Sequence, residues 1–119
     1  MNSYKELIVW KKSMELVKQI YRLTEKFPKS ELFGLTSQMR RSAISIPTNI
    51  AEGNLRGTRK DYRHFLITAF GSAGELETHL EIAQMLNYCK NIDLKSTQEL
   101  LVEILKMLNV MIKKLVPSP

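Results

Sequence analysis

Two histidines and one cysteine are the side chains of this 119-residue chain best suited to nucleophilic or metal chemistry. Glu75 and His79 stand four residues apart, so one helix face would present them as an acid–base pair. The same spacing fits an ordinary structural contact, which we favour because no loop long enough to build a substrate cleft is predicted nearby. Cys89 has a single cationic neighbour, Lys90, and we expect it to be a small packing residue.

Metal and cofactor sites are not predicted. A di-iron site in a helical bundle needs two Glu-x-x-His pairs, but Leu76 stands three residues before His79 and Asp61 three before His64. One Cys and two His are also too few for the usual zinc spacings. The chain has no phosphate-binding loop, no dinucleotide fingerprint and no Gly-x-Ser-x-Gly elbow. We therefore expect no cofactor, no metal and no enzymatic activity.

Positive charge is concentrated in the middle of the chain. The formal net charge is +6, and residues 40–63 carry six bases against two acids. Such a zone is a candidate footprint for a polyanion, although a solvated face that keeps the protein soluble is an equally good interpretation. The bases that we expect to contact phosphates are Arg40, Arg56, Arg59, Lys60 and Arg63.

Length and composition indicate one ordinary globular domain over residues 1–119, with 44% hydrophobic and 25% charged residues. No stretch approaches the roughly 20 apolar residues of a membrane span. No secretory signal is apparent, because Lys5 and Glu6 precede the first apolar run. The single cysteine rules out an internal disulfide, which fits a reducing compartment. We expect a cytoplasmic protein that does not bind membranes.

Apolar residues that recur in steps of three and four predict four amphipathic helices, over about residues 5–26, 31–52, 59–87 and 94–116. Short connections favour an antiparallel up-down-up-down bundle. The predicted core stripes are Leu7, Trp10, Met14, Val17 and Tyr21; Leu35, Met39, Ala43, Ile46 and Ile50; Tyr62, Leu66, Ala69, Ala73, Leu76, Leu80 and Ala83; and Leu101, Ile104, Leu108, Met111 or Ile112, and Leu115.

Glycine, proline and capping residues predict the helix boundaries and bends. Gly53 would end the second helix in a left-handed conformation, with residues 54–57 as the connector, and Pro47 would kink that helix without breaking it. Thr58 with Asp61 resembles a capping box, and the last helix begins at a similar box of Ser96 and Glu99 or at Asp93, and ends at Pro117. Gly71 and Gly74 lie mid-helix, where we expect a close crossing by another helix.

Two polar lines run beside the predicted core stripes. A freely solvated helix face more often shows Lys and Glu than small hydroxyls and amides, so these lines predict half-buried surfaces bonded to each other or to another subunit. Arg41 is then expected to pair with Glu75 or Glu52. A polar flank without any partner is the alternative. The residues are Gln38, Arg41, Ser45, Asn49 and Glu52 on the second helix, and Thr68, Ser72, Glu75 and His79 on the third.

The run from Gln38 to Gly53 closely resembles the hallmark of a bacterial four-helix-bundle family, the 23S rRNA intervening-sequence proteins. Three shorter pieces agree: residues 7–10, Phe27-Pro28 with residues 33–35, and residues 71–76. The resemblance extends from about residue 4 to residue 88, with small departures at Ser42 and Ala73.

This resemblance implies a bundle that assembles into a homopentameric ring. Some members are encoded in insertions within large-subunit ribosomal RNA genes. A related branch, the accessory variability protein of diversity-generating retroelements, binds nucleic acid and a partner reverse transcriptase through a basic surface. Two functions therefore remain open: a non-enzymatic, oligomeric RNA- or DNA-binding accessory protein, and a self-assembling scaffold for a protein partner such as a reverse transcriptase.

Overall fold

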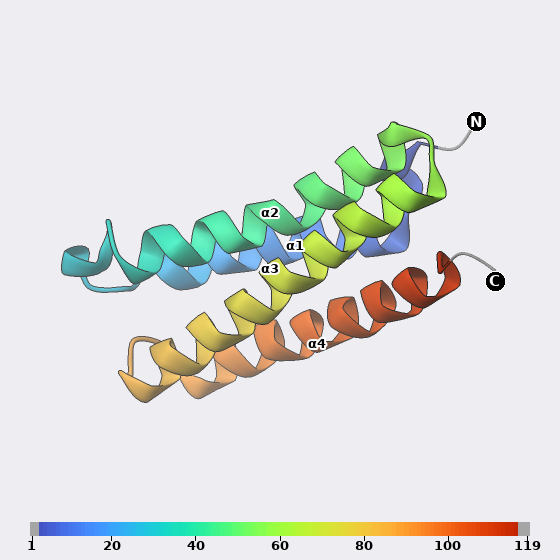
Figure 1. The fold of residues 1–119 in the computed structure, drawn as a ribbon. Coiled ribbons are helices and arrows are strands. Elements are labelled where there is room, and N and C mark those ends of the chain that lie inside the picture. The colour runs from blue at the N-terminus through green and yellow to red at the C-terminus, as the bar shows by residue number, and fades with distance from the viewer. Residues whose placement is uncertain (1–2, 117–119) are drawn as a thin grey trace.

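The computed structural model describes residues 3–116, which form four long helices and no strand (Figure 1). The elements in chain order are the 3-10 turn η1 (Tyr4–Glu6), α1 (Ile8–Thr24), the 3-10 turn η2 (Lys29–Glu31), α2 (Leu35–Arg56), α3 (Arg59–Met85) and α4 (Asn91–Lys114).

Each helix packs against two others, which closes the bundle. Helix α2 contacts α1 and α3, and α4 contacts the same two helices. Short connections reverse the chain between successive helices, so neighbours run antiparallel (Figure 1). The molecule measures 48 × 21 × 21 Å. The predicted all-α four-helix bundle is therefore confirmed for the described chain.

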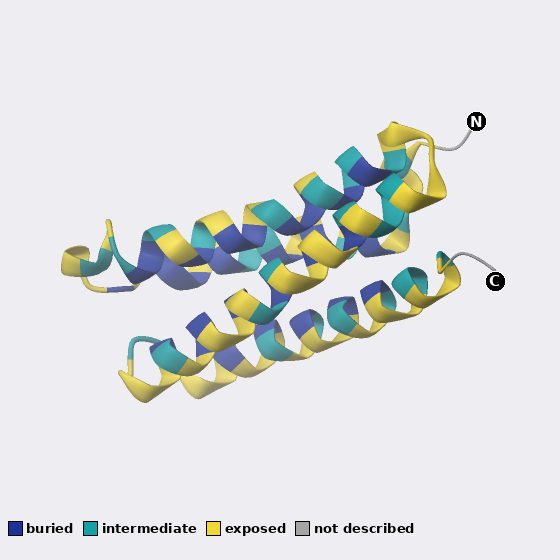
Figure 2. Ribbon diagram, viewed as in Figure 1, coloured by how far each residue is buried: buried dark blue, intermediate teal, exposed yellow. Residues whose placement is uncertain are grey.

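Three of the four predicted core stripes are confirmed (Figure 2). All five stripe residues of α2 are buried, and on α3 only Tyr62 remains partly exposed. Helix α4 buries Leu101, Ile104 and Leu108. Near its end, Met111, Ile112 and Leu115 are half-buried against the core. Burial of these side chains is the main driving force for closing the bundle.

The predicted core stripe of α1 is wrong. The buried face carries Val9, Leu16, Ile20 and Leu23, whereas the predicted stripe lies beside it and stays half-buried or exposed. Ser13 interrupts the true stripe in the sequence, but it is fully buried and its hydroxyl donates to the Val9 carbonyl at 2.7 Å. Helix α1 thus has two apolar stripes: one is buried in the core, and the other packs against the core only in part.

Helix α2 has the predicted length of 22 residues, but it begins and ends four residues later than predicted. It continues through Pro47 and Gly53 and ends at Arg56, and Gly57 takes the left-handed conformation with φ of 87°. Gly53 serves a different purpose, because a Cβ there would lie 2.8 Å from the Phe65 Cβ. Gly53 is therefore where α2 approaches α3 closely.

The predicted close crossing at Gly71 and Gly74 is wrong, because a Cβ added at either position would meet no atom within 4 Å. The start of α3 is as predicted, since the Thr58 hydroxyl accepts from the Asp61 amide at 3.1 Å. The start of α4 is not, because the helix begins at Asn91 after Lys90, without a side-chain cap. Pro117 lies outside the described residues.

Candidate nucleic-acid interface

A two-residue turn joins α2 to α3 and holds two arginines at one end of the bundle. Arg56 is the last residue of α2, and Arg59 is the first of α3. Between them, Gly57 adopts a positive φ that side chains disfavour, and Thr58 caps the next helix. The turn therefore fixes the backbone positions of Arg56 and Arg59 relative to each other.

Arg59 joins the end of α4 to this turn. Its Nη2 donates to the backbone carbonyl of Lys114 at 2.8 Å, which satisfies one of the free carbonyls at a helix C-terminus. The bond brings Lys113 and Lys114 beside the arginines, although 55 residues separate its partners in the chain. Sequence reasoning missed these lysines as part of the basic zone, yet the antiparallel order of the helices already places the end of α4 beside the start of α3.

The other predicted bases of this region are Arg56, Lys60 and Arg63, and they differ in whether their charged groups are bonded to other residues of the described chain. Arg56 forms an ion pair with Glu52 at 2.7 Å and lies 5.0 Å from the centre of the Phe65 ring. Lys60 is exposed and forms no ion pair with any described residue. Arg63 is half-buried, and its Nε has no hydrogen-bond partner within the described chain.

Arg40 does not join this group. Its Nε donates to the Thr24 hydroxyl at 2.9 Å, and its guanidinium lies 4.4 Å from the centre of the Tyr21 ring. These contacts tie the first half of α2 to the last turn of α1, so Arg40 acts within the subunit. Arg40 thus makes contacts different from those of the bases around the α2–α3 turn, and its contact with phosphates stays a prediction.

We call the resulting surface the basic end. It lies where the chain begins, α2 turns into α3 and α4 finishes, and its turn and helix ends are largely exposed (Figure 2). Three acids, Glu6, Glu52 and Asp61, lie among its bases. The basic end comprises Lys5, Arg56, Arg59, Lys60, Arg63, Lys113 and Lys114.

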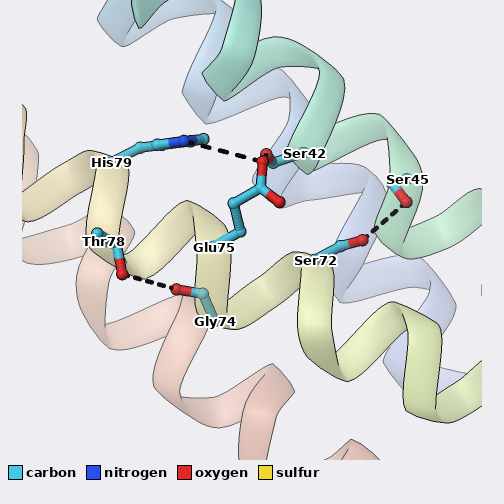
Figure 3. Close-up of polar contacts among 7 residues, drawn as sticks. All are labelled: Ser42, Ser45, Ser72, Gly74, Glu75, Thr78 and His79. Carbon is cyan, nitrogen blue, oxygen red and sulfur yellow. Dashed lines mark hydrogen bonds and ion pairs between the residues drawn. The ribbon is translucent and has the colours of Figure 1, made fainter.

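Among the described residues, the two predicted polar lines bond to each other at the pair Ser45 and Ser72 (Figure 3). Four other members of the lines are exposed: Gln38, Arg41, Thr68 and Glu75. The Ser42 hydroxyl donates to Glu75 Oε1 at 2.8 Å, and the hydroxyls of Ser45 and Ser72 lie 2.8 Å apart. On α2, the Asn49 side chain donates to the Ser45 hydroxyl at 2.9 Å. These contacts form a polar seam at one edge of the α2–α3 contact.

The predicted ion pair of Arg41 is not formed within residues 3–116. Glu52 pairs with Arg56, and Glu75 accepts from Ser42. Arg41 is exposed and instead lines an open polar groove of about 440 Å³ that also contains Glu75. The other residues of this groove are Gln38, Ser42, Ser45 and Ser72.

His79 is the buried member of the second polar line. Its Nε2 lies 3.8 Å from Glu75 Oε1, while its Nδ1 is buried without a partner among the described residues (Figure 3). Burial lowers the pKa of His79, and the nearby Glu75 carboxylate only partly opposes this effect. Folding therefore favours the neutral form of the His79 imidazole.

Cys89 is half-buried against the core, and burial together with Asp93 raises the pKa of its thiol. Such a thiol is a poor nucleophile at neutral pH. Nowhere in residues 3–116 do three His, Cys, Asp or Glu side chains gather closely enough to hold a metal ion. None of the helices in that range has the length and apolar character that a membrane crossing requires.

Comparisons with known proteins support the four-helix fold. The chain is similar to a crystal structure described as a protein of unknown function from the S23 ribosomal protein family of Bacteroides thetaiotaomicron. The two share 29% sequence identity with a TM-score of 0.80, over 89% of this chain and 99% of that one. No curated protein matches the chain. The family model described as 23S rRNA-intervening sequence protein matches residues 5–110, and the chain belongs to that family.

Proposed function

We propose that this protein is a non-enzymatic accessory protein that binds RNA or DNA by contacting phosphates with its basic end. The observation that carries the proposal is the hydrogen bond from Arg59 to the Lys114 carbonyl. It joins two segments that are far apart in the chain, and the described segments that form the basic end carry seven bases against the three acids Glu6, Glu52 and Asp61. A concentrated field of one sign attracts a polyanion more strongly than scattered charges do.

Recognition at this surface is expected to be independent of base sequence. The aromatic rings nearby are already engaged, since Phe65 lies beneath Arg56 and Tyr4 packs edge-on against Trp10 at 5.5 Å. Without a free aromatic platform the surface offers little base stacking, and its cations read charge and spacing alone.

Salt dependence tests this proposal. Fluorescence anisotropy with labelled RNA and DNA of arbitrary sequence should show binding at about 50 mM salt, and affinity should fall steeply as salt rises because each neutralised phosphate releases counterions. Scrambling the sequence should change the affinity little. Failure of the wild-type protein to bind any nucleic acid at low salt contradicts the proposal and favours the protein scaffold instead.

We further propose that the working form is a homopentameric ring, the number that the family resemblance implies. Repetition of the basic end around a ring would strengthen weak phosphate contacts through multivalency. The candidate subunit interface is the polar groove between α2 and α3. Gln38 and Arg41 are exposed in this groove. Arg41 forms no ion pair among the described residues, and we propose that it pairs with a carboxylate of a neighbouring copy in the ring.

Light scattering tests the ring. The wild-type protein should scatter as a pentamer at micromolar concentration, and Arg41→Ala should shift it toward smaller species because a partly desolvated charge contact is lost. Arg22→Ala, at an exposed arginine on α1, is the matched control and should leave the assembly unchanged. A monomeric wild type would contradict both the ring and this interface.

A further inference from the structure

The second apolar stripe of α1 packs against the core only in part, and its open side forms a groove with α2. From α1 come Trp10, Met14 and Val17, spaced at i, i+4 and i+7. They face a second line on α2 that includes Ile44 and Leu55. The groove has a volume of about 470 Å³, and its floor contains Pro47 and Ala51.

Large apolar side chains in this groove are left open to solvent. Met14 is 45% exposed, Ile44 43% and Leu55 68%. A contiguous apolar surface of this kind is typical of an interaction site, whereas single exposed apolar residues are not. The stretch from Trp10 to Val17 covers about 10 Å of helix, enough to receive three apolar anchors of a partner helix at the same spacing.

Charges along the rim of the groove indicate which kind of helix fits. Lys11 and Lys18 flank Met14 on the solvent side of α1, at i−3 and i+4. Both are exposed and form no ion pair with a described residue. Glu52 is the acid that lines the groove, and its carboxylate is already paired with Arg56. The rim is therefore positive.

We propose that the α1–α2 groove docks an amphipathic helix of a partner protein, with apolar anchors along one face and acidic residues beside them. The anchors would pack against Trp10, Met14 and Ile44, and the carboxylates would meet Lys11 and Lys18. The site is separate from the basic end, so it does not depend on the proposed nucleic-acid function.

Trp10 provides a direct readout, because it is the one tryptophan of the chain. The probe is a synthetic 18-residue helical peptide with Leu at i, i+4 and i+7 flanked by Glu, compared with the same peptide carrying Lys in place of Glu. The acidic peptide should shift Trp10 emission to shorter wavelength as the indole leaves water. It should bind at least about tenfold more tightly than the basic peptide, and Lys11→Glu with Lys18→Glu should reverse that preference.

Two matched variants locate the binding. Ile44→Glu places a charge in the groove and should abolish the peptide response, whereas Val110→Glu, at a 50% exposed position on α4, should retain it. Circular dichroism checks that both variants are folded. An unchanged Trp10 emission at about 1 mM acidic peptide would overturn the proposal, as would equal binding of both peptides or full binding by Ile44→Glu.

Two further outcomes would also overturn it, by assigning another occupant to the groove. If Trp10 emission shifts with protein concentration alone, and Ile44→Glu removes both this shift and the associated species, a second copy of the chain covers the groove. If RNA produces the shift and Ile44→Glu prevents it, nucleic acid occupies the groove.

Discussion

At the basic end, close backbone packing and a bond from the Arg59 side chain to the Lys114 carbonyl hold the helices together. Gly53 lets α2 approach α3, and the two-residue turn joins them directly. At the opposite end, where α1 finishes and α4 begins, side-chain bonds make the connections: Tyr88 donates to Glu31 at 2.8 Å, and Thr97 donates to Gln19 at 3.0 Å. Exposed lysines without an ion pair among the described residues lie at both ends, so the ends differ in the arginines gathered at the first and in the side-chain bonds that close the second.

The same contrast applies to the arginines. Arg40 uses its guanidinium within the subunit, on Thr24 and the Tyr21 ring. At the basic end, Arg59 uses one N–H on the end of α4, which leaves its other donors available. The number of arginines in a segment is thus a poor guide to binding, and the bonds that each one already makes inside the fold decide what it can offer.

The largest expected effect tests the close packing at the basic end. Gly53→Ala should lower the free energy of unfolding by about 1–3 kcal/mol, because the new Cβ would overlap Phe65 and Tyr62. Gly71→Ala is the matched control in open space and should raise stability by up to about 1 kcal/mol through helix propensity. Equal effects in denaturant titrations would show that α2 and α3 do not meet closely at Gly53.

The next effect concerns the buried His79, nearer the opposite end. Its folded-state pKa is lowered, so the unfolded chain binds the proton more readily, and stability should fall as the pH drops from about 7.5 through the ordinary histidine pKa of about 6.5. This contribution cannot exceed about 1.4 kcal/mol per pH unit for one proton. His79→Gln should lose less stability on acidification than the wild type.

His64 is exposed and provides the control for this measurement. Urea titrations of the wild type, His79→Gln and His64→Gln at a series of pH values compare removal of the buried imidazole with removal of an exposed one. If the two variants behave alike, His79 does not carry the proton linkage.

A smaller effect is expected at the opposite end. Thr97→Val keeps the shape of a buried side chain but removes its hydrogen bond to Gln19, and should cost about 1 kcal/mol. Thr68→Val, at an exposed threonine that bonds only to its own helix, should change stability by less than about 0.5 kcal/mol. A negligible effect at Thr97 would contradict the role given to side-chain bonds at this end.

Much of the fold follows from apolar spacing, which identified four helices and the core faces of three. It failed on α1 because Ser13 breaks the buried stripe, while an uninterrupted apolar line runs beside it. A buried serine is tolerated there because its hydroxyl bonds to the preceding turn. The spacing rule cannot distinguish a core face from a groove, since both are apolar.

Glycines and charges were harder to interpret because their roles depend on tertiary contacts. Gly53 and Gly71 both interrupt helices, yet only the first lies against another helix. A contact between the lines of Ser45 and Ser72 could be predicted from the sequence, since each serine lies on a polar line beside a predicted core stripe. Lys114 could not be joined to Arg59 from local sequence, because the link exists only after the bundle closes.

We propose that the basic end, and not the overall charge of the protein, binds nucleic acid. Two triple variants separate these explanations: Lys60, Lys113 and Lys114→Glu at the basic end, and Lys29, Lys90 and Lys95→Glu at the opposite end. All six lysines are exposed and unpaired among the described residues. Each Lys→Glu change removes two charges, so three changes take both variants from +6 to a formal net charge of zero.

Anisotropy titration of a labelled RNA at about 50 mM salt is the deciding measurement. The variant of the basic end should lose roughly tenfold or more in affinity and show a shallower salt dependence, because up to three phosphate contacts are gone. The variant of the opposite end should bind nearly as well as the wild type. Equal loss of affinity in the two variants would contradict the account, since net charge rather than the basic end would then control binding.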